Sequence, residues 1–256
     1  MQFKQDTMGD VVESERQMIL QGADCYGEYF INAMEFNNLL NNFIESVNDP
    51  SKFIAIAFIF QIRKYHSLAL FSSVRRHHVQ ATMNMRYVIE AAQWAAFAMG
   101  NEEQEKFCRK DTNGIIYVDD RHEKTMYEWL DANFKLKADE TRQLKKILSG
   151  GGSHSNIAYV FQNFEMKPFH DAGFKMSFFD SEDDYRIKTD LWFVANSAMG
   201  ILDLFYGVNQ QFQVFKLEED FNIKFERLVE QNNRLKVEMM QTENFKKIEA
   251  LRSSNL

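Results

Sequence analysis

The chain has 256 residues, of which 45% are hydrophobic and 24 are Phe, and its formal net charge is −7. This apolar content excludes an intrinsically disordered chain, and the acidic balance argues against a general nucleic-acid binder, which needs a basic surface. With only two Pro and long segments free of helix breakers, the composition predicts an all-α fold, an up-down helical bundle.

The same bulk properties predict a soluble, cytoplasmic protein. Cys25 and Cys108 lie far apart without metal-like spacing, which is typical of reduced thiols. The first residues are polar and acidic, so no signal peptide is predicted. Of the longest apolar runs, Phe53–Phe60 is too short to span a bilayer and Leu191–Tyr206 is interrupted by two polar residues, so we expect no membrane partner.

The first half of the chain reads as a polar leader followed by three helices with apolar residues at three- and four-residue steps. Asp49, Pro50 and Ser51 separate the first two helices, and a short basic cluster, Arg75–His78, separates the second from the third. We interpret this cluster as a solvated helix end or, alternatively, a local basic groove. The expected leader and helices cover residues 1–22, 23–47, 52–76 and 80–99.

The second half begins with weaker patterns and ends in a long helix. The triple glycine in Ser149–Asn156 is the strongest local discontinuity, and Ser181 to Asp184 have the spacing of a helix-capping box. Asp139 is a second expected N-cap. We expect a short acidic helix at 101–110, a loop or short strand at 111–120, helices at 123–133 and 139–148, an irregular segment or hairpin at 157–179, and a helix to about 211.

The C-terminal segment, 217–256, differs from the bundle domain at 23–211 because it is highly charged. Six residues from Phe221 to Met239 step by four and three, which is a heptad pattern with Asn232 at a core position. Two interpretations remain open: a coiled-coil seam that pairs two copies into a homodimer, or a helix folded back onto its own bundle.

A polar stripe on the central helix is the first candidate site. Thr82, Arg86, Glu90 and Gln93 fall within a sector of roughly 80° on an otherwise apolar helix. The apolar neighbours predict a buried Arg86–Glu90 ion pair, which costs several kcal/mol per ion unless further hydrogen bonds compensate. A structural network and a functional site both explain such a pair.

His154 is the second candidate, because the glycine-rich loop that carries it is free to direct the imidazole toward a site. A capping or hydrogen-bonding role explains it equally. The chain has no Glu-x-x-His, His-Glu-x-x-His or Cys-x-x-Cys motif and no Walker loop, so we expect neither metal nor cofactor.

These residues resemble those of an uncharacterised, mainly bacterial helical family that is likened to HEPN domains. The resemblance covers about 23–211 and depends on Arg86 and Glu90 in an apolar helix and on His154 after a glycine-rich turn. It implies a dimeric helical protein linked to phage defence or stress. Ser155 and Asn156 stand where the family has Pro and Ser, and the Arg–His spacing of HEPN ribonucleases is not present.

The leading hypothesis is a binding or regulatory protein in which Arg86, Glu90 and His154 line a polar pocket. The alternative is a metal-independent, ribonuclease-like enzyme acting on RNA or a nucleotide, with His154 as general acid/base and Arg86 stabilising phosphate charge. A third hypothesis is a structural dimerisation protein that uses the 217–245 helix.

Overall fold

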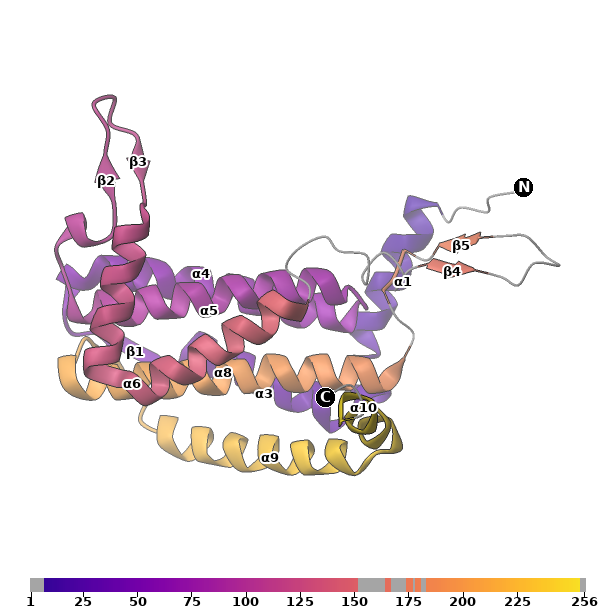
Figure 1. Ribbon diagram of the computed structural model, residues 1–256. Coiled ribbons are helices and arrows are strands. Elements are labelled where there is room, and N and C mark those ends of the chain that lie inside the picture. The colour runs from indigo at the N-terminus through magenta and orange to yellow at the C-terminus, as the bar shows by residue number, and fades with distance from the viewer. Residues whose placement is uncertain (1–6, 152–163, 167–173, 177, 181–182, 254–256) are drawn as a thin grey trace.

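The computed structural model describes residues 7–151, 164–166, 174–176, 178–180 and 183–253, and the predicted all-α bundle is confirmed. Four long helices, α3 (Glu28–Asn42), α4 (Phe53–Val74), α5 (His78–Gly100) and α8 (Asp184–Phe212), pack side by side (Figure 1). The α4–α5 pair is the most extensive contact between elements.

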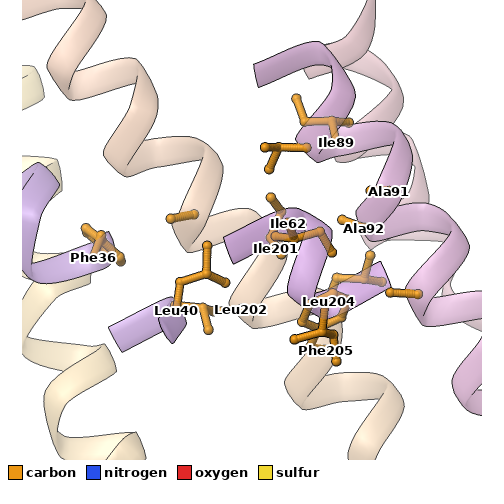
Figure 2. Packing of buried hydrophobic residues seen from close by; sticks show 14 of the residues in the cluster. Phe36, Leu40, Ile62, Ile89, Ala91, Ala92, Ile201, Leu202, Leu204 and Phe205 are labelled. Carbon is orange, nitrogen blue, oxygen red and sulfur yellow. The ribbon is translucent and has the colours of Figure 1, made fainter. Parts of the chain in front are cut away.

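The inward faces of these four helices form one core. Phe36 and Leu40 of α3, Ile62 of α4, Ile89 of α5 and Phe205 of α8 are all 1% exposed or less, and Figure 2 shows them converging between the helices. Each such side chain contributes about 1.5–3 kcal/mol of transfer free energy when it is fully buried. The core therefore fixes α5, which carries the candidate site.

Residues 8–20 form a helix, so the expected loosely held leader is corrected. Helix α1 (Met8–Leu20) begins at Thr7, whose hydroxyl accepts the Asp10 N–H while the Asp10 carboxylate accepts the Thr7 N–H. This reciprocal cap satisfies two of the N–H groups that a helix start leaves unpaired.

The basic cluster at the α4–α5 turn is ion-paired. Glu15 of α1 lies 2.6 Å from His77 Nε2 and 3.2 Å from Arg75, and Asp190 of α8 lies 2.8 Å from His78 Nδ1. These contacts join α1 and α8 to the turn, so the cluster is a junction between helices and neither a solvated end nor an open basic groove.

The expected single helix at 23–47 is divided. Gly27 has a φ of 54°, which separates α2 (Gly22–Tyr26) from α3. Beyond α3 the chain is extended, and β1 (Ile44–Val47) pairs antiparallel with β6 (Phe215–Leu217). The helical pattern extended too far because Phe43 and Ile44, which follow α3, still pack on the core of the bundle.

A β-hairpin and a kinked helix follow α5. A 3₁₀ turn, η2 (Gln104–Lys106), replaces the expected acidic helix, and β2 (Arg109–Lys110) pairs with β3 (Ile116–Tyr117). A second 3₁₀ turn, η1 (Pro50–Lys52), precedes α4.

Helix α6 (Asp120–Gly151) covers both helices expected at 123–148 and has one non-helical residue, Phe134. Asp139 is therefore inside a helix, and the predicted N-cap there is wrong. The hairpin expected near 157–179 is present as a pairing of β4 (Phe164–Met166) with β5 (Phe174–Met176).

The start of α8 is displaced from the expected cap. Its N-cap is Asp183, whose carboxylate accepts the Tyr185 N–H, and the helix begins at Asp184, the last residue of the predicted box. The predicted cap at Ser181 is therefore corrected. Helices α9 (Phe221–Gln241) and α10 (Glu243–Ser253) complete the chain.

The heptad seam of α9 lies against its own bundle. Phe221, Leu228, Asn232, Leu235 and Met239 are buried, and α9 packs on α3 and α8. Of the two interpretations of the seam, the folded-back helix is the one observed, so these residues are already covered within one chain.

Two helical segments are long and apolar enough to cross a membrane by length and composition, Pro50–Val74 and Asp184–Phe212. In the second, 56% of the most apolar window is buried inside the protein, as expected of a core helix. The core helices of soluble proteins meet the same criterion, so the soluble, cytoplasmic location stays a prediction.

Candidate functional site

The polar stripe of α5 is present but only partly buried. Thr82 and Gln93 are buried, whereas the Arg86 and Glu90 side chains are 29% and 36% exposed. Arg86 Nε donates to Glu90 Oε1 over 3.1 Å. The expectation of a buried ion pair is therefore corrected: the pair lies at the rim of a pocket, because the helix that covers Gln93 leaves Glu90 open.

His154 lies outside the described residues. Its expected contact with Arg86 and Glu90 therefore stays a prediction, and the site described below is built from the other residues.

A pocket of about 380 Å³ opens beside Arg86 and Glu90. Helix α5 forms one wall, both halves of α6 form another, and the link from β3 to α6 forms the third. We call it the α5–α6 pocket; its described lining is Arg86, Glu90, Gln93, Trp94, Val118, Asp119, Asp120, Glu123, Met126, Tyr127 and Lys145.

The kink in α6 assembles this pocket. Lys145 Nζ lies 3.2 Å from Glu123 Oε1 and 3.0 Å from the Tyr127 hydroxyl, although Glu123 and Lys145 are 22 residues apart. In a straight helix those residues would be about 33 Å apart, at 1.5 Å per residue. The break at Phe134 folds the second half of α6 back along the first, and so brings a lysine to two earlier side chains.

Lys145 connects α6 to the ion pair of α5. Its Nζ lies 3.2 Å from Glu90 Oε1, the same oxygen that Arg86 contacts. Tyr127 in turn donates to Gln93 Oε1 over 3.3 Å. The two helices are thus joined by a continuous polar network across the base of the pocket.

The protonation states of this network are fixed by their surroundings. Burial lowers the pKa of Lys145, but its contacts with Tyr127 and Glu90 raise the pKa by more, and the result lies above the usual lysine value. Burial raises the pKa of Tyr127. At neutral pH the pocket therefore holds a charged lysine and a neutral phenol.

The described lining has an excess of negative charge. Glu90, Asp119, Asp120 and Glu123 face two cations, Arg86 and Lys145. The ion pairs of Glu90 and Glu123 use Oε1 of each carboxylate. The Glu90 and Glu123 side chains are 36% and 48% exposed, so both carboxylates are accessible to a ligand.

Asp119 and Asp120 at the third wall have different roles. Asp119 caps α6 by accepting the Arg121 N–H, and it pairs with the Arg109 and Arg121 guanidinium groups. Asp120 is exposed, and the part of the chain that the structure describes gives it no partner. Asp120 is thus the carboxylate most available to a ligand.

No group of three or more potential metal ligands occurs among the described residues. Three of the pocket carboxylates, those of Glu90, Asp119 and Glu123, are instead bonded to cations or backbone N–H groups. What this arrangement provides is hydrogen-bond acceptors and negative charge beside the ring of Trp94.

The sequence predicts the α5 side of the pocket, through Arg86, Glu90 and Gln93, but not the α6 side. The sequence predicts two separate helices at 123–133 and 139–148. No regular spacing then connects Lys145 in the second helix with Glu123 and Tyr127 in the first. The expected break between those helices was the one indication that these side chains could meet, because a short connection in a helical bundle usually reverses the chain direction.

Comparison with protein-family models, with curated proteins and with solved structures finds no match to this chain. The resemblance to HEPN-like proteins therefore stays a prediction.

Proposed function

We propose that this protein is a binding or regulatory protein whose α5–α6 pocket takes a small organic cation, an amine or ammonium compound. The observation that carries this proposal is the excess of carboxylates in the pocket lining, next to an aromatic ring. Organic cations are recognised by carboxylates and by the faces of Trp and Tyr rings.

The exposed carboxylates define how such a ligand would bind. A primary ammonium group donates hydrogen bonds and accepts none, so it matches the carboxylates of Glu90, Glu123 and Asp120. A quaternary ammonium group has no N–H and would be held by the negative charge and by the Trp94 ring. The methylene groups of the ligand would then contact Trp94 and Met126, the apolar part of the lining.

An anionic ligand fits the described lining less well. Arg86 and Lys145 both contact Glu90, so a phosphate would have to displace a carboxylate from each of them. It would also approach the negative charge of the exposed Asp120. The ribonuclease-like alternative would therefore depend on His154 and its loop rather than on these lining residues.

A thermal-shift experiment with four probes tests the proposal. Putrescine and choline are the cations, and inorganic phosphate and AMP are the anions. At about ten times its Kd, a ligand adds about 1.4 kcal/mol to the stability, which raises Tm by roughly 3–6 °C for a chain of this size. We expect such a rise with a cation and none with the anions.

The opposite pattern would contradict the proposal. A Tm rise with AMP or phosphate that Arg86→Gln abolishes would support the nucleotide-directed alternative. No rise with either cation, up to millimolar concentration, would remove the cation-binding function.

A further inference from the structure

The β2–β3 hairpin presents four consecutive apolar residues to solvent. Ile115, Ile116, Tyr117 and Val118 are 62%, 58%, 44% and 60% exposed. In Figure 1 the hairpin projects away from the helices at one end of the bundle, so no helix covers it. Exposed contiguous apolar residues on an edge strand are typical of an interaction surface.

The turn of the hairpin holds this strand in an extended conformation. Asp111 Oδ1 accepts N–H groups from Asn113 and Ile115, each over 2.8 Å, and Gly114 occupies the left-handed region with a φ of 81°. The strand is therefore preformed before any partner arrives, which lowers the entropic cost of pairing.

The two edges of the hairpin differ in charge. β2 carries Arg109 and Lys110, the kind of residues that prevent edge-to-edge pairing, whereas the β3 edge from Ile115 to Val118 has no charge, proline or bulge. Among the described residues β3 pairs only with β2. The open edge is thus the one without protection.

The hydrogen-bonding groups on that edge can be assigned. Asp111 N donates to Ile115 O, so the backbone groups of Ile115 are on the side of β2. In an antiparallel ladder this side alternates from one residue to the next, so the N–H and C=O groups of Ile116 and Val118 are directed away from β2. These groups require an extended partner, since only a strand supplies donors and acceptors at this spacing.

We propose that β3 pairs antiparallel with β3 of a second copy of this chain, with Tyr117 on the two-fold axis. In this register the backbone of Ile116 in each copy forms hydrogen bonds with the backbone of Val118 in the other. These bonds use all the outward N–H and C=O groups of both residues. The apolar residues are self-complementary, as an isologous interface requires.

Charge permits a second copy as the occupant, because the two β3 edges that would meet are both uncharged. In the resulting order β2-β3-β3-β2 the two basic strands lie outermost, about 14 Å apart at a strand spacing near 4.8 Å. That separation exceeds the Debye length of about 8 Å at physiological salt, so the repulsion between Arg109 and Lys110 of the two copies is largely screened.

Antiparallel pairing places the two bundles at opposite ends of the shared sheet. It also brings the turn of each copy toward Asp119 and Asp120 of the other, at the mouth of the α5–α6 pocket. The interface is small, so we expect a reversible dimer with a Kd in the micromolar range. The pairing does not depend on any ligand in the pocket.

Sedimentation analysis of the full chain from 1 to 200 µM tests the pairing. We expect a concentration-dependent dimer, and Tyr117→Lys should weaken it at least tenfold. Leu136→Lys is the matched control, since Leu136 is 81% exposed on α6, away from the hairpin, and should leave the dimer unchanged. A wild-type monomer at all concentrations, or a dimer that Tyr117→Lys leaves intact, overturns the proposal.

Cross-linking tests the register independently. A non-hydrogen-bonded antiparallel pair has Cα atoms about 4.5 Å apart, within the range of a disulfide. With the free thiols Cys25 and Cys108 replaced by Ser, Tyr117→Cys should oxidise to a disulfide-linked dimer and Ile115→Cys should do so at least tenfold more slowly. Equal rates for the two variants contradict the Tyr117-centred register.

Discussion

Gln93 is the residue that joins the core of the bundle to the α5–α6 pocket. It is 1% exposed, and its amide donates to Thr141 Oγ1 over 3.1 Å while its carbonyl accepts from Tyr127. Both polar ends of the side chain are thus satisfied by α6. The position of α6 on α5 is set by a buried polar contact as well as by apolar packing.

Thr141→Val tests this contact. Valine preserves the shape of Thr141 but leaves the Gln93 amide without its acceptor, which should lower the unfolding free energy by about 1–3 kcal/mol in chemical denaturation. Thr125→Val is the control, because the Thr125 hydroxyl donates to the backbone oxygen of Arg121 on an exposed face of α6, as the Thr141 hydroxyl does to that of Ala138. It should cost under about 0.5 kcal/mol. Equal losses would argue against the buried network.

His66 makes the stability of the bundle depend on pH. It is fully buried between α3, α4 and α8, with Nδ1 2.8 Å from Asn37 Oδ1 and Nε2 3.2 Å from Val194 O. Burial lowers its pKa to about 4, although the Val194 carbonyl partly opposes this. Because the unfolded chain takes up a proton near pH 6.5, stability is complete above that pH and is lost as pH falls toward 4.

The expected loss from His66 reaches roughly 3 kcal/mol at pH 4, since each pKa unit corresponds to about 1.4 kcal/mol. The unfolding free energy of the wild type and of His66→Gln should be measured between pH 7 and 4.5. The variant should be less stable at pH 7 and should lose less stability on acidification. Identical pH slopes for the two proteins would contradict the assignment.

At the scale of elements, α9 is held on the bundle by a layer of asparagines as well as by its apolar seam. Asn232, which is 0% exposed, accepts from Asn32 Nδ2 over 2.9 Å and donates to Asn196 Oδ1 over 3.3 Å. These bonds fix the register of α9 against α3 and α8. A slip by one turn would leave buried amides unpaired.

Asn232→Leu should therefore destabilise the chain by about 2–3 kcal/mol, because Asn32 and Asn196 lose their partner inside the protein. Asn233→Leu, one residue along on the exposed face, should change stability by under about 0.5 kcal/mol. Denaturation of both variants measures the difference. If Asn232→Leu were neutral, the asparagine layer would not position α9.

Whether a heptad seam pairs with another chain or with its own bundle is not encoded in the seam. The spacing from Phe221 to Met239 identifies which face of α9 is buried. The identity of the covering surface depends on the eight residues between α8 and α9, where β6 returns the chain to β1. A three-residue strand gives too short a pattern to be recognised.

At the scale of the whole molecule, the helical architecture was predictable and the pocket only in part. Long breaker-free segments with regular apolar spacing gave α4, α5 and α8 nearly at their observed bounds. The polar stripe of α5 gave one wall of the pocket. The degree of burial of Arg86 and Glu90 was not predictable, because it depends on where α6 crosses α5.

The β2–β3 hairpin was expected only as a loop or short strand, for a related reason. Its apolar residues face solvent, so they lack the alternation of a half-buried strand. In the structure the same residues are exposed, and the proposed pairing with a second copy uses them. Sequence patterns that report burial cannot identify residues kept exposed for a partner.

The most direct test of the account is isothermal titration of putrescine into the wild type, Glu123→Gln and Glu128→Gln. Glu123 lines the α5–α6 pocket, whereas Glu128 on the same helix is 68% exposed and, among the described residues, is ion-paired with Lys124. We predict saturable one-site binding to the wild type, about tenfold weaker binding to Glu123→Gln, which corresponds to about 1.4 kcal/mol, and wild-type binding to Glu128→Gln. No binding to the wild type, or an equal loss in both variants, would contradict a cation site in this pocket.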